Sequence, residues 1–424
     1  MYEKRLIDSI LKKYVESSPA ILVEGAKAVG KTSTCSNLAN TTYSLDKKGT
    51  LEILSNSPEM IFNDRPPILL DEWQFSPELW TFIRHAVDDG LPDGFVIFTG
   101  SSPRINSKIH SGAGRIIRLK MRTFSIEERK MSENYIHVSD FFNSQKNFKI
   151  SGRTSLKLVD YLDEIYRSGF PGIRSRSEMI RKKMLQDYLE NIIHHDFKEN
   201  GFLIKKPEAL FQWLKTYAAV VGTPTKFQTI VDIAMKNNEE IPSKPTTNSY
   251  REALSILNII EEVPAWLPMG HKLLNNISKA PKHFLLDPAL ITSILGIEKK
   301  CLYLFEPPKP IGKFNKTFNG QLIEALVYQS LAVYADVNNA KVSYLRLNNG
   351  AREIDFILEK GNSLILFEVK TKTAIDDEDV KHLNWLENEA QDEYQITKIA
   401  LYTGEFAYTR KDNVYVIPIG MLGA

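Results

Sequence analysis

Two patterns of apolar residues alternate along the chain from residue 1 to about residue 130. Short, wholly apolar runs are separated by longer stretches in which apolar residues recur every three or four positions. The short runs predict strands that are buried on both faces, and the longer stretches predict helices that cover them. This alternation is typical of an α/β fold with a parallel sheet. We expect its strands at Ala20–Val23, Tyr43–Ser44, Ile68–Leu70, Gly94–Thr99 and Ile116–Leu119.

The middle of the chain has a different pattern. Residues 155–200 carry apolar residues at helical spacing, interrupted by Gly169-Phe170-Pro171-Gly172. Three more amphipathic stretches follow, at 210–219, 227–234 and 246–257, and then an extended segment at 259–266. Three helices followed by a strand fit a winged-helix arrangement. Its third helix would meet nucleic acid through Lys244, Thr246, Thr247, Asn248, Ser249 and Arg251, although so few basic residues fit a packing role equally well.

The first apolar run leads into a glycine-rich loop with the pattern Gly-x-x-x-x-Gly-Lys-Thr, between Gly25 and Thr32. Such a loop between a strand and a helix is a P-loop, whose backbone N–H groups point at phosphate oxygens. Lys31 would neutralise the β- and γ-phosphates of ATP, and Thr32 would bind Mg²⁺. We assign nucleotide binding to Gly25, Ala28, Val29, Gly30, Lys31, Thr32 and Ser33.

Polar residues at the ends of later strands complete this site. Asp71 ends an apolar run and would lie beside the Mg²⁺ ion, while Glu72 would orient the attacking water. Ser101 follows another buried strand and would sense the γ-phosphate, although a serine-rich turn explains it equally well. Arg115, in a glycine loop, would serve as an arginine finger for a neighbouring subunit. A plain surface arginine is the alternative.

A second group of charged residues lies near the end of the chain. Glu324 falls on a predicted helix, Asp355 at the start of an apolar strand, and Glu368 and Lys370 at the end of the next one. Residues two apart on a strand share a face, so two carboxylates and an ammonium group come together. Asp355 and Glu368 would hold Mg²⁺ with help from Glu324, and Lys370 would activate water. This order resembles the PD-(D/E)XK nuclease core.

The motifs together resemble a known family. They are Gly25–Thr32, Leu69-Leu70-Asp71-Glu72-Trp73-Gln74, Phe98-Thr99-Gly100-Ser101-Ser102, Ala113-Gly114-Arg115-Ile116, Gly169-Phe170-Pro171, and Tyr188 with Asp196. They are similar to those of prokaryotic AAA-type ATPases with a C-terminal restriction-endonuclease-like domain, most of which are known only as ATP-binding proteins. The chain departs from the family at Ala26-Lys27-Ala28, where an arginine and a glutamine are usual.

This resemblance implies the architecture and the partners. We expect an ATPase core at 1–130, a helical lid at 131–204, a winged-helix-like domain at 205–300 and a restriction-endonuclease-like α/β domain at 301–424. It implies that Lys31, Thr32, Asp71 and Glu72 bind and hydrolyse Mg-ATP, with the Ser101 region as sensor and Arg115 as finger. It also implies a homo-oligomer, such as a hexamer.

Composition narrows the function classes. The 424 residues, 43% hydrophobic and 25% charged, are ordinary for a multidomain globular protein, and a net charge of +2 does not indicate a nucleic-acid binder.

Cys35 and Cys301 are far apart, so we expect neither a disulfide nor a zinc site. We expect His194-His195-Asp196 to be structural, because adjacent helical residues point apart. With no signal peptide and no long apolar run, we expect a cytoplasmic protein without a membrane segment.

Three functions from different classes fit these features. The first is an AAA-type Mg-ATP hydrolase that drives a nuclease-like domain acting on DNA or RNA. The second is an ATP-dependent switch that binds nucleic acid or protein through a catalytically inactive nuclease-like domain. The third, a small-molecule kinase, is disfavoured by Glu72 and by the long appended domains.

Overall fold

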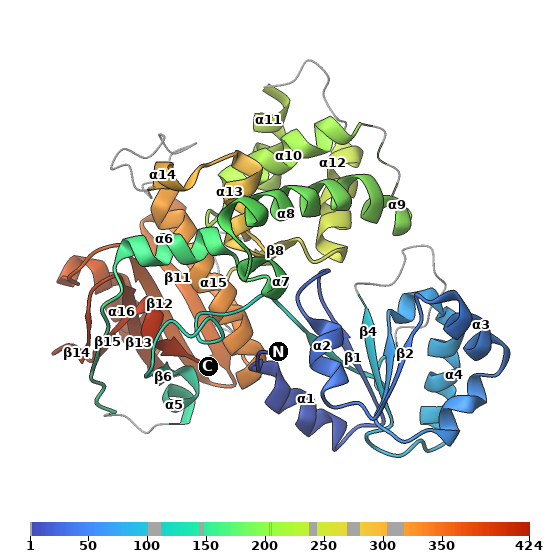
Figure 1. Ribbon diagram of the computed structural model, residues 1–424. Coiled ribbons are helices and arrows are strands. Elements are labelled where there is room, and N and C mark those ends of the chain that lie inside the picture. Colours follow the sequence, from blue (N-terminus) through green and yellow to red (C-terminus); the bar gives the residue numbers. More distant parts are fainter. Residues whose placement is uncertain are drawn as a thin grey trace.

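The computed structural model describes residues 2–100, 112–143, 148–202, 204, 206–236, 244–268, 280–302 and 318–424. Figure 1 shows three groups of elements: a first sheet with its helices in blue, a set of helices in green and yellow, and a second sheet in orange and red. The two sheets carry the expected ATP and metal residues, and the helical group between them along the chain carries the candidate nucleic-acid helix.

The first group is a five-stranded parallel sheet in the order β2-β3-β4-β1-β5. Its strands confirm the predicted α/β pattern within a few residues: β1 (Ala20–Glu24), β2 (Thr41–Ser44), β3 (Ile68–Asp71), β4 (Val96–Gly100) and β5 (Ile117–Lys120). The helices are α1 (Ile7–Val15), α2 (Lys31–Ser36), α3 (Lys48–Asn56) and α4 (Pro77–Asp88). Because β4 lies between β1 and β3, its carboxyl end separates the glycine-rich loop from Asp71.

Both faces of this sheet are buried, which explains the wholly apolar runs. Alternate residues such as Leu22 and Phe98 pack against Trp73 and Trp80, whose ring centroids are 4.4 Å apart. The residues between them belong to the cluster that includes α1. One face of the sheet is therefore covered by Trp73 and Trp80, and the other by the cluster that includes α1.

The second group is helical, as predicted. It contains α6 (Leu158–Arg167), α7 (Pro171–Arg174), α8 (Glu178–Asn191), a π-helical turn (Ile192–Asp196), α9 (Phe197–Glu199), α10 (Pro207–Ala219), α11 (Phe227–Lys236), α12 (Lys244–Ile256), α13 (Pro288–Leu295) and α14 (Lys299–Leu302). After α12, β8 (Ile260–Val263) pairs antiparallel with β9 (Lys282–Leu285). The predicted break falls between α6 and α7, where the backbone N–H of Gly169 donates to Asp287 Oδ2 at 2.7 Å.

The third group is a mixed sheet in the order β10-β11-β12-β13-β15-β14-β7. Its strands are β10 (Lys341–Leu347), β11 (Arg352–Lys360), β12 (Ser363–Lys370), β13 (Gln395–Tyr402), β14 (Phe406–Thr409), β15 (Val414–Pro418) and β7 (Gly152–Arg153). Helix α15 (Phe318–Asn338) packs with Phe356 and Leu358, whereas α16 (Asp377–Ala390) packs with Ile357 between them. The two helices therefore cover opposite faces. Among the described helices, none is both long and apolar enough to cross a membrane.

Part of the expected lid region joins this last sheet. Strand β7 pairs with β14, and β6 (Ile136–His137), just before α5 (Val138–Asn143), pairs with β16 (Leu422–Gly423). Two segments from before the helical group thus pair with strands from after it: β7 at the edge of the seven-stranded sheet, and β6 in a separate two-stranded sheet with β16. Two-residue strands leave no periodic pattern, so the sequence did not predict this pairing.

Candidate functional site

The glycine-rich loop leaves β1 in a shape that depends on two glycines. Gly25 and Gly30 have φ of 155° and 103°, in the region that residues with a Cβ rarely adopt. A Cβ at Gly25 would also lie 2.2 Å from the carbonyl oxygen of Met121, which follows β5. The loop can therefore run close to the neighbouring strand only because these positions are glycine.

Lys31 is buried at the centre of this loop. Its ammonium donates to the carbonyl oxygens of Gly25 and Ala26, each at 2.9 Å. Burial lowers the pKa of Lys31, while the carboxylates of Glu72 and Asp71 act in the opposite direction. An anion that enters this loop would replace the two carbonyl oxygens as the acceptor of the hydrogen bonds from the Lys31 ammonium.

Asp71 accepts hydrogen bonds from hydroxyl groups on two other elements. Thr32, in the first turn of α2, donates to Asp71 Oδ1 at 2.9 Å, and Thr99 at the end of β4 donates to the same oxygen. The structure thus brings together Lys31, Thr32 and Asp71, as the motifs predict. Thr99 was missed as a site residue, although the end of a buried strand at the carboxyl edge of the sheet was a signal for it.

Glu72 follows β3 with a left-handed backbone (φ 58°), and its carboxylate accepts a hydrogen bond from Gln74. Both residues line a cleft of about 590 Å³ that also contains Lys31 and Thr32. The opposite wall comes from the helical group, through Pro171, Gly172, Glu199 and Asn200. The cleft therefore lies between the first sheet and the helices.

An ion pair ties the glycine-rich loop to those helices. Lys27 Nζ lies 2.6 Å from Asp196 Oδ1 and 3.5 Å from Glu199 Oε2, and the Tyr188 hydroxyl donates to the Lys27 carbonyl at 3.2 Å. Asp196, which the sequence analysis expects to be structural and names with Tyr188 in the family motifs, thus contacts the loop directly.

Two other residues are expected in the nucleotide site. Ser101 lies outside the described residues. Arg115 pairs through Nε with Asp88 Oδ1 of α4, and this hydrogen bond lowers the pKa of Asp88. In the described part of the chain, Arg115 is not one of the residues that line the cleft.

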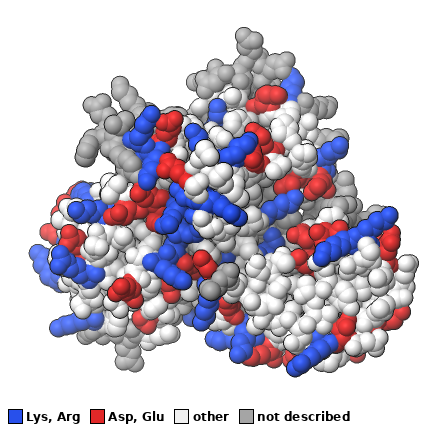
Figure 2. Space-filling view, viewed as in Figure 1, with Lys and Arg blue, Asp and Glu red and all other residues white. Residues whose placement is uncertain are grey.

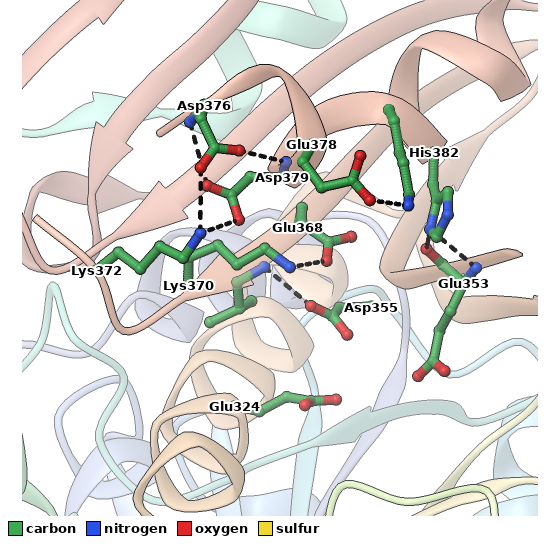
Figure 3. Close-up of polar contacts among 12 residues, drawn as sticks. Glu324, Glu353, Asp355, Glu368, Lys370, Lys372, Asp376, Glu378, Asp379 and His382 are labelled. Atoms are coloured by element: carbon green, nitrogen blue, oxygen red, sulfur yellow. Dashed lines mark hydrogen bonds and ion pairs between the residues drawn. The ribbon is translucent and has the colours of Figure 1, made fainter. Parts of the chain in front are cut away.

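The C-terminal carboxylates come together as the spacing predicts. Glu368 and Lys370 at the end of β12 form an ion pair of 2.6 Å, and Asp355 on β11 accepts from the backbone N–H of Val369 at 2.9 Å. Figure 3 shows Asp355 between this pair and Glu324, which projects from α15. Glu324 and Asp355 are each 1% exposed.

A buried lysine that the sequence did not predict lies among these carboxylates. Lys282 of β9 is 0% exposed, and its Nζ is 2.8 Å from Glu324 Oε1, 3.4 Å from Asp355 Oδ1 and 3.4 Å from Glu353 Oε1. The only sequence signal was the apolar run Phe284-Leu285-Leu286 shortly after Lys282, which equally describes a strand that starts at the surface. Its partners are too distant in sequence to suggest the cluster.

The arrangement does not fit a divalent metal ion. Oxygen ligands surround Mg²⁺ at 2.0–2.1 Å and Ca²⁺ at 2.3–2.6 Å, but here the lysine ammonium occupies the space between the carboxylates. Within the described residues, no group of three or more His, Cys, Asp and Glu side chains is placed to hold a metal ion. Glu324, Asp355 and Glu368 as metal ligands, and Lys370 as a catalytic group, stay predictions.

Polar contacts, several of them buried, join the first sheet to the other two groups. Arg5 donates to Glu128 (2.8 Å), to the Val29 carbonyl of the glycine-rich loop (2.9 Å) and to the Arg122 carbonyl (2.8 Å). The Arg122 side chain in turn binds Glu261 of β8 at 3.1 Å and Asp336 of α15. A chain of hydrogen bonds and ion pairs, through both side chains and backbone carbonyls, therefore runs from the loop to β8 and α15.

The candidate nucleic-acid helix, α12, is partly turned inward. Thr247 is 1% exposed, and Arg251 forms an ion pair with Glu262 of β8. Basic side chains are more accessible elsewhere, since Arg176, Lys182 and Lys183 at α7 and α8 are exposed. Figure 2 shows Lys and Arg gathered near the middle of one face, amid mixed charges.

Comparison with family models divides the chain into three parts. Residues 17–130 match an AAA domain, and residues 158–300 and 319–422 match two families described as domains of unknown function, DUF8612 and DUF4143. The α/β sheet with its glycine-rich loop is thus a P-loop ATPase domain of the AAA type. No curated protein matches the chain.

Solved structures resemble the chain only weakly. The Walker-type ATPase PABY2304 of Pyrococcus abyssi is 15% identical with a TM-score of 0.40, covering 69% of this chain and 96% of its own. The Drosophila ORC bound to DNA is 13% identical (TM-score 0.19; 61% and 86%). Can2 of Sulfobacillus thermosulfidooxidans, in complex with cyclic tetra-adenylate, is 11% identical (TM-score 0.21; 95% and 96%). Such low TM-scores support no conclusion about this chain.

Proposed function

We propose that this protein binds and hydrolyses Mg-ATP in the cleft at the carboxyl ends of β1, β3 and β4. The observation that carries the proposal is the convergence of Lys31, Thr32 and Asp71 beside a cleft lined by Glu72. Lys31 would release the carbonyls of its own loop to bind phosphate oxygens. The hydroxyl of Thr32 and the carboxylate of Asp71 would hold Mg²⁺, which neutralises phosphate charge when bound.

Glu72 would orient the attacking water, since its carboxylate lines the cleft one residue beyond Asp71. Gln74 holds that carboxylate and so limits its orientations. Thr99 would act beside Asp71 as a positioning residue. Backbone groups of Gly25, Ala28, Val29, Gly30 and Ser33 would contact the phosphates.

Arg115 would complete the site of a neighbouring copy in a homo-oligomer. Its absence from the described lining of its own cleft and its position directly after Gly114 support this role. Asp88 holds the guanidinium ready at the surface.

The C-terminal sheet would have a restriction-endonuclease-like fold. A helix, three antiparallel strands, a second helix and a parallel fourth strand follow one another as α15, β10–β12, α16 and β13. Asp355 and Glu368 lie on its adjacent strands β11 and β12. The helices α10–α12 with β8 and β9 would be a winged-helix-like domain that serves mainly in packing, because Arg251 is bound inside the chain.

Among the functions considered, the arrangement favours an ATP-dependent switch over an ATP-driven nuclease. Lys282 occupies the carboxylate cluster, and the contacts of Arg5 and Arg122 offer a path by which the nucleotide loop acts on β8 and α15. Nucleic acid is the proposed ligand of the switch, supported by the exposed Arg176, Lys182 and Lys183.

ATP hydrolysis is tested with two variants. Lys31→Ala should abolish ATP binding, because it removes the charge that meets the phosphates, whereas Glu72→Gln should bind ATP and lose hydrolysis. Nucleotide affinity and phosphate release are the measurements. Lys48→Ala and Glu52→Gln, at exposed positions of α3, serve as matched controls and should behave as wild type. Normal turnover by the Glu72 variant would refute the assignment.

A further inference from the structure

The carboxylate cluster in the C-terminal part of the chain already contains a cation. We propose that the ammonium group of Lys282 takes the place of a divalent metal ion there, so that this protein neither binds a metal at Glu324 and Asp355 nor cleaves nucleic acid. The inference deepens the switch function proposed above and rests on the nuclease-like arrangement of α15, β11 and β12.

Distances and burial indicate a closed internal ion cluster. Lys282 Nζ donates to Glu324 Oε1 at 2.8 Å and lies 3.4 Å from Asp355 Oδ1 and from Glu353 Oε1. The lysine is 0% exposed, and Glu324 and Asp355 are each 1% exposed. In a site so shielded from water, a buried charge needs a partner of opposite sign. The carboxylates are that partner for Lys282, and Lys282 is that partner for the carboxylates.

The lysine is held so that it cannot easily leave. Its backbone belongs to β9, where Lys282 is paired with Val263 of β8. Its ammonium lies 5.3 Å from the ring centroid of Tyr344 and 5.4 Å from that of Phe356, within the range of cation–π attraction. These neighbours enclose the side chain at the position where it meets the carboxylates.

A metal ion and this ammonium exclude each other. A divalent ion bound to Glu324 and Asp355 would lie within a few ångströms of a fixed positive charge, in a setting of low dielectric constant. Glu368 does not supply a free alternative, because Lys370 pairs with it at 2.6 Å. Both lysines thus compensate carboxylates that a metal-dependent nuclease would use as ligands.

Calorimetric titration of the full chain with Mn²⁺ tests the proposal. The variants are Lys282→Met, which keeps the side-chain length without the charge, and Lys282→Arg, which keeps the charge as a matched control. Each variant is compared with and without Asp355→Asn. Mn²⁺ binding near Asp71 is the same in both proteins of such a pair, so it cancels when their titrations are subtracted. We expect Asp355→Asn to leave Mn²⁺ binding unchanged in the wild type and in Lys282→Arg, and to remove a binding event from Lys282→Met.

Two results would overturn the proposal. One is Mn²⁺ binding by the wild type that Asp355→Asn abolishes. The other is a folded Lys282→Met protein with no Mn²⁺ binding that depends on Asp355. Should Lys282→Met fail to fold, Lys282→Gln takes its place, and the comparison of wild type with Asp355→Asn is decisive alone. ATP hydrolysis, measured on the same samples, reports separately on the proposed ATPase, whose failure would leave the Mn²⁺ result unaffected.

Discussion

At the scale of single residues, buried charges in this molecule are matched by partners from distant parts of the chain. Glu261 of β8 accepts from Lys120 (2.6 Å), Arg122 (3.1 Å) and the hydroxyl of Tyr328 (2.8 Å). Burial by itself would raise the pKa of Glu261, but Arg122 and Lys120 outweigh it and lower the pKa to about 2. The ionised carboxylate therefore stabilises the folded state.

Glu261→Gln should remove a pH-dependent part of this stability. Because the folded pKa of about 2 lies below the usual value near 4.5, the contribution is complete above about pH 5 and is lost as the pH falls towards 2. A shift of this size corresponds to about 3 kcal/mol, to order of magnitude. Urea denaturation at pH 7 and pH 3 should show the variant less stable at pH 7 and the difference reduced to roughly half at pH 3, while exposed Glu16→Gln stays close to wild type throughout. A difference independent of pH would contradict this account.

Which residues could be predicted depended on how far apart their partners lie in sequence. Lys31, Thr32 and Asp71 belong to local motifs whose geometry follows from strand, loop and helix order. Lys282 belongs to no motif, since its neighbours Glu324 and Asp355 are brought to it only by the packing of α15 and β11. A lysine at the start of an apolar run is ordinarily a surface residue.

At the scale of elements, the wholly apolar strands of the first sheet were predictable because burial on both faces leaves a continuous signal. The short strands β6 and β7 were not, because two residues carry no periodicity and their partners β16 and β14 follow the helical group. The segment before α1 was also missed as a support of the glycine-rich loop. There, Arg5 joins α1 to Val29, Arg122 and Glu128.

Arg5→Lys should loosen the nucleotide loop. Lysine keeps the charge but cannot reach all three acceptors with one ammonium group, so buried carbonyls lose partners at a cost of about 1–3 kcal/mol. We expect a lower Tm and several-fold weaker ATP affinity, measured by thermal unfolding and nucleotide titration. Arg153→Lys, an exposed pair with Glu405, is the matched control. Unchanged ATP affinity would show that Arg5 does not position the loop.

At the scale of the whole molecule, the three groups of elements are joined through a few buried or partly buried arginines. Arg122 binds both β8 and α15, and Arg129 donates to Gln329 of α15 and to the carbonyl of Glu164 in α6. These contacts would therefore transmit a movement of the ATPase domain to both of the other groups of elements. Such coupling is what an ATP-dependent switch requires.

Turnover should depend on assembly, because Arg115 is proposed to act on a neighbour's ATP. Phosphate release per subunit should fall on dilution. Mixing Arg115→Ala subunits with Lys31→Ala subunits should restore activity, since the second supplies the arginine that the first lacks. Lys31→Ala mixed with a Lys31→Ala and Arg115→Ala double variant is the inactive control. Turnover that is flat over a wide dilution series would exclude this arrangement.

The position of β7 at the end of the C-terminal sheet bears on how this part of the protein can be studied in isolation. A fragment that starts at residue 301 would lack β7, and β14 would become an open edge available to other chains. The same fragment would lack Lys282, so Glu324 and Asp355 would face each other without their cation. Aggregation or metal uptake by such a fragment would then be a product of the truncation, and only the intact chain reports what the carboxylates do in the native protein.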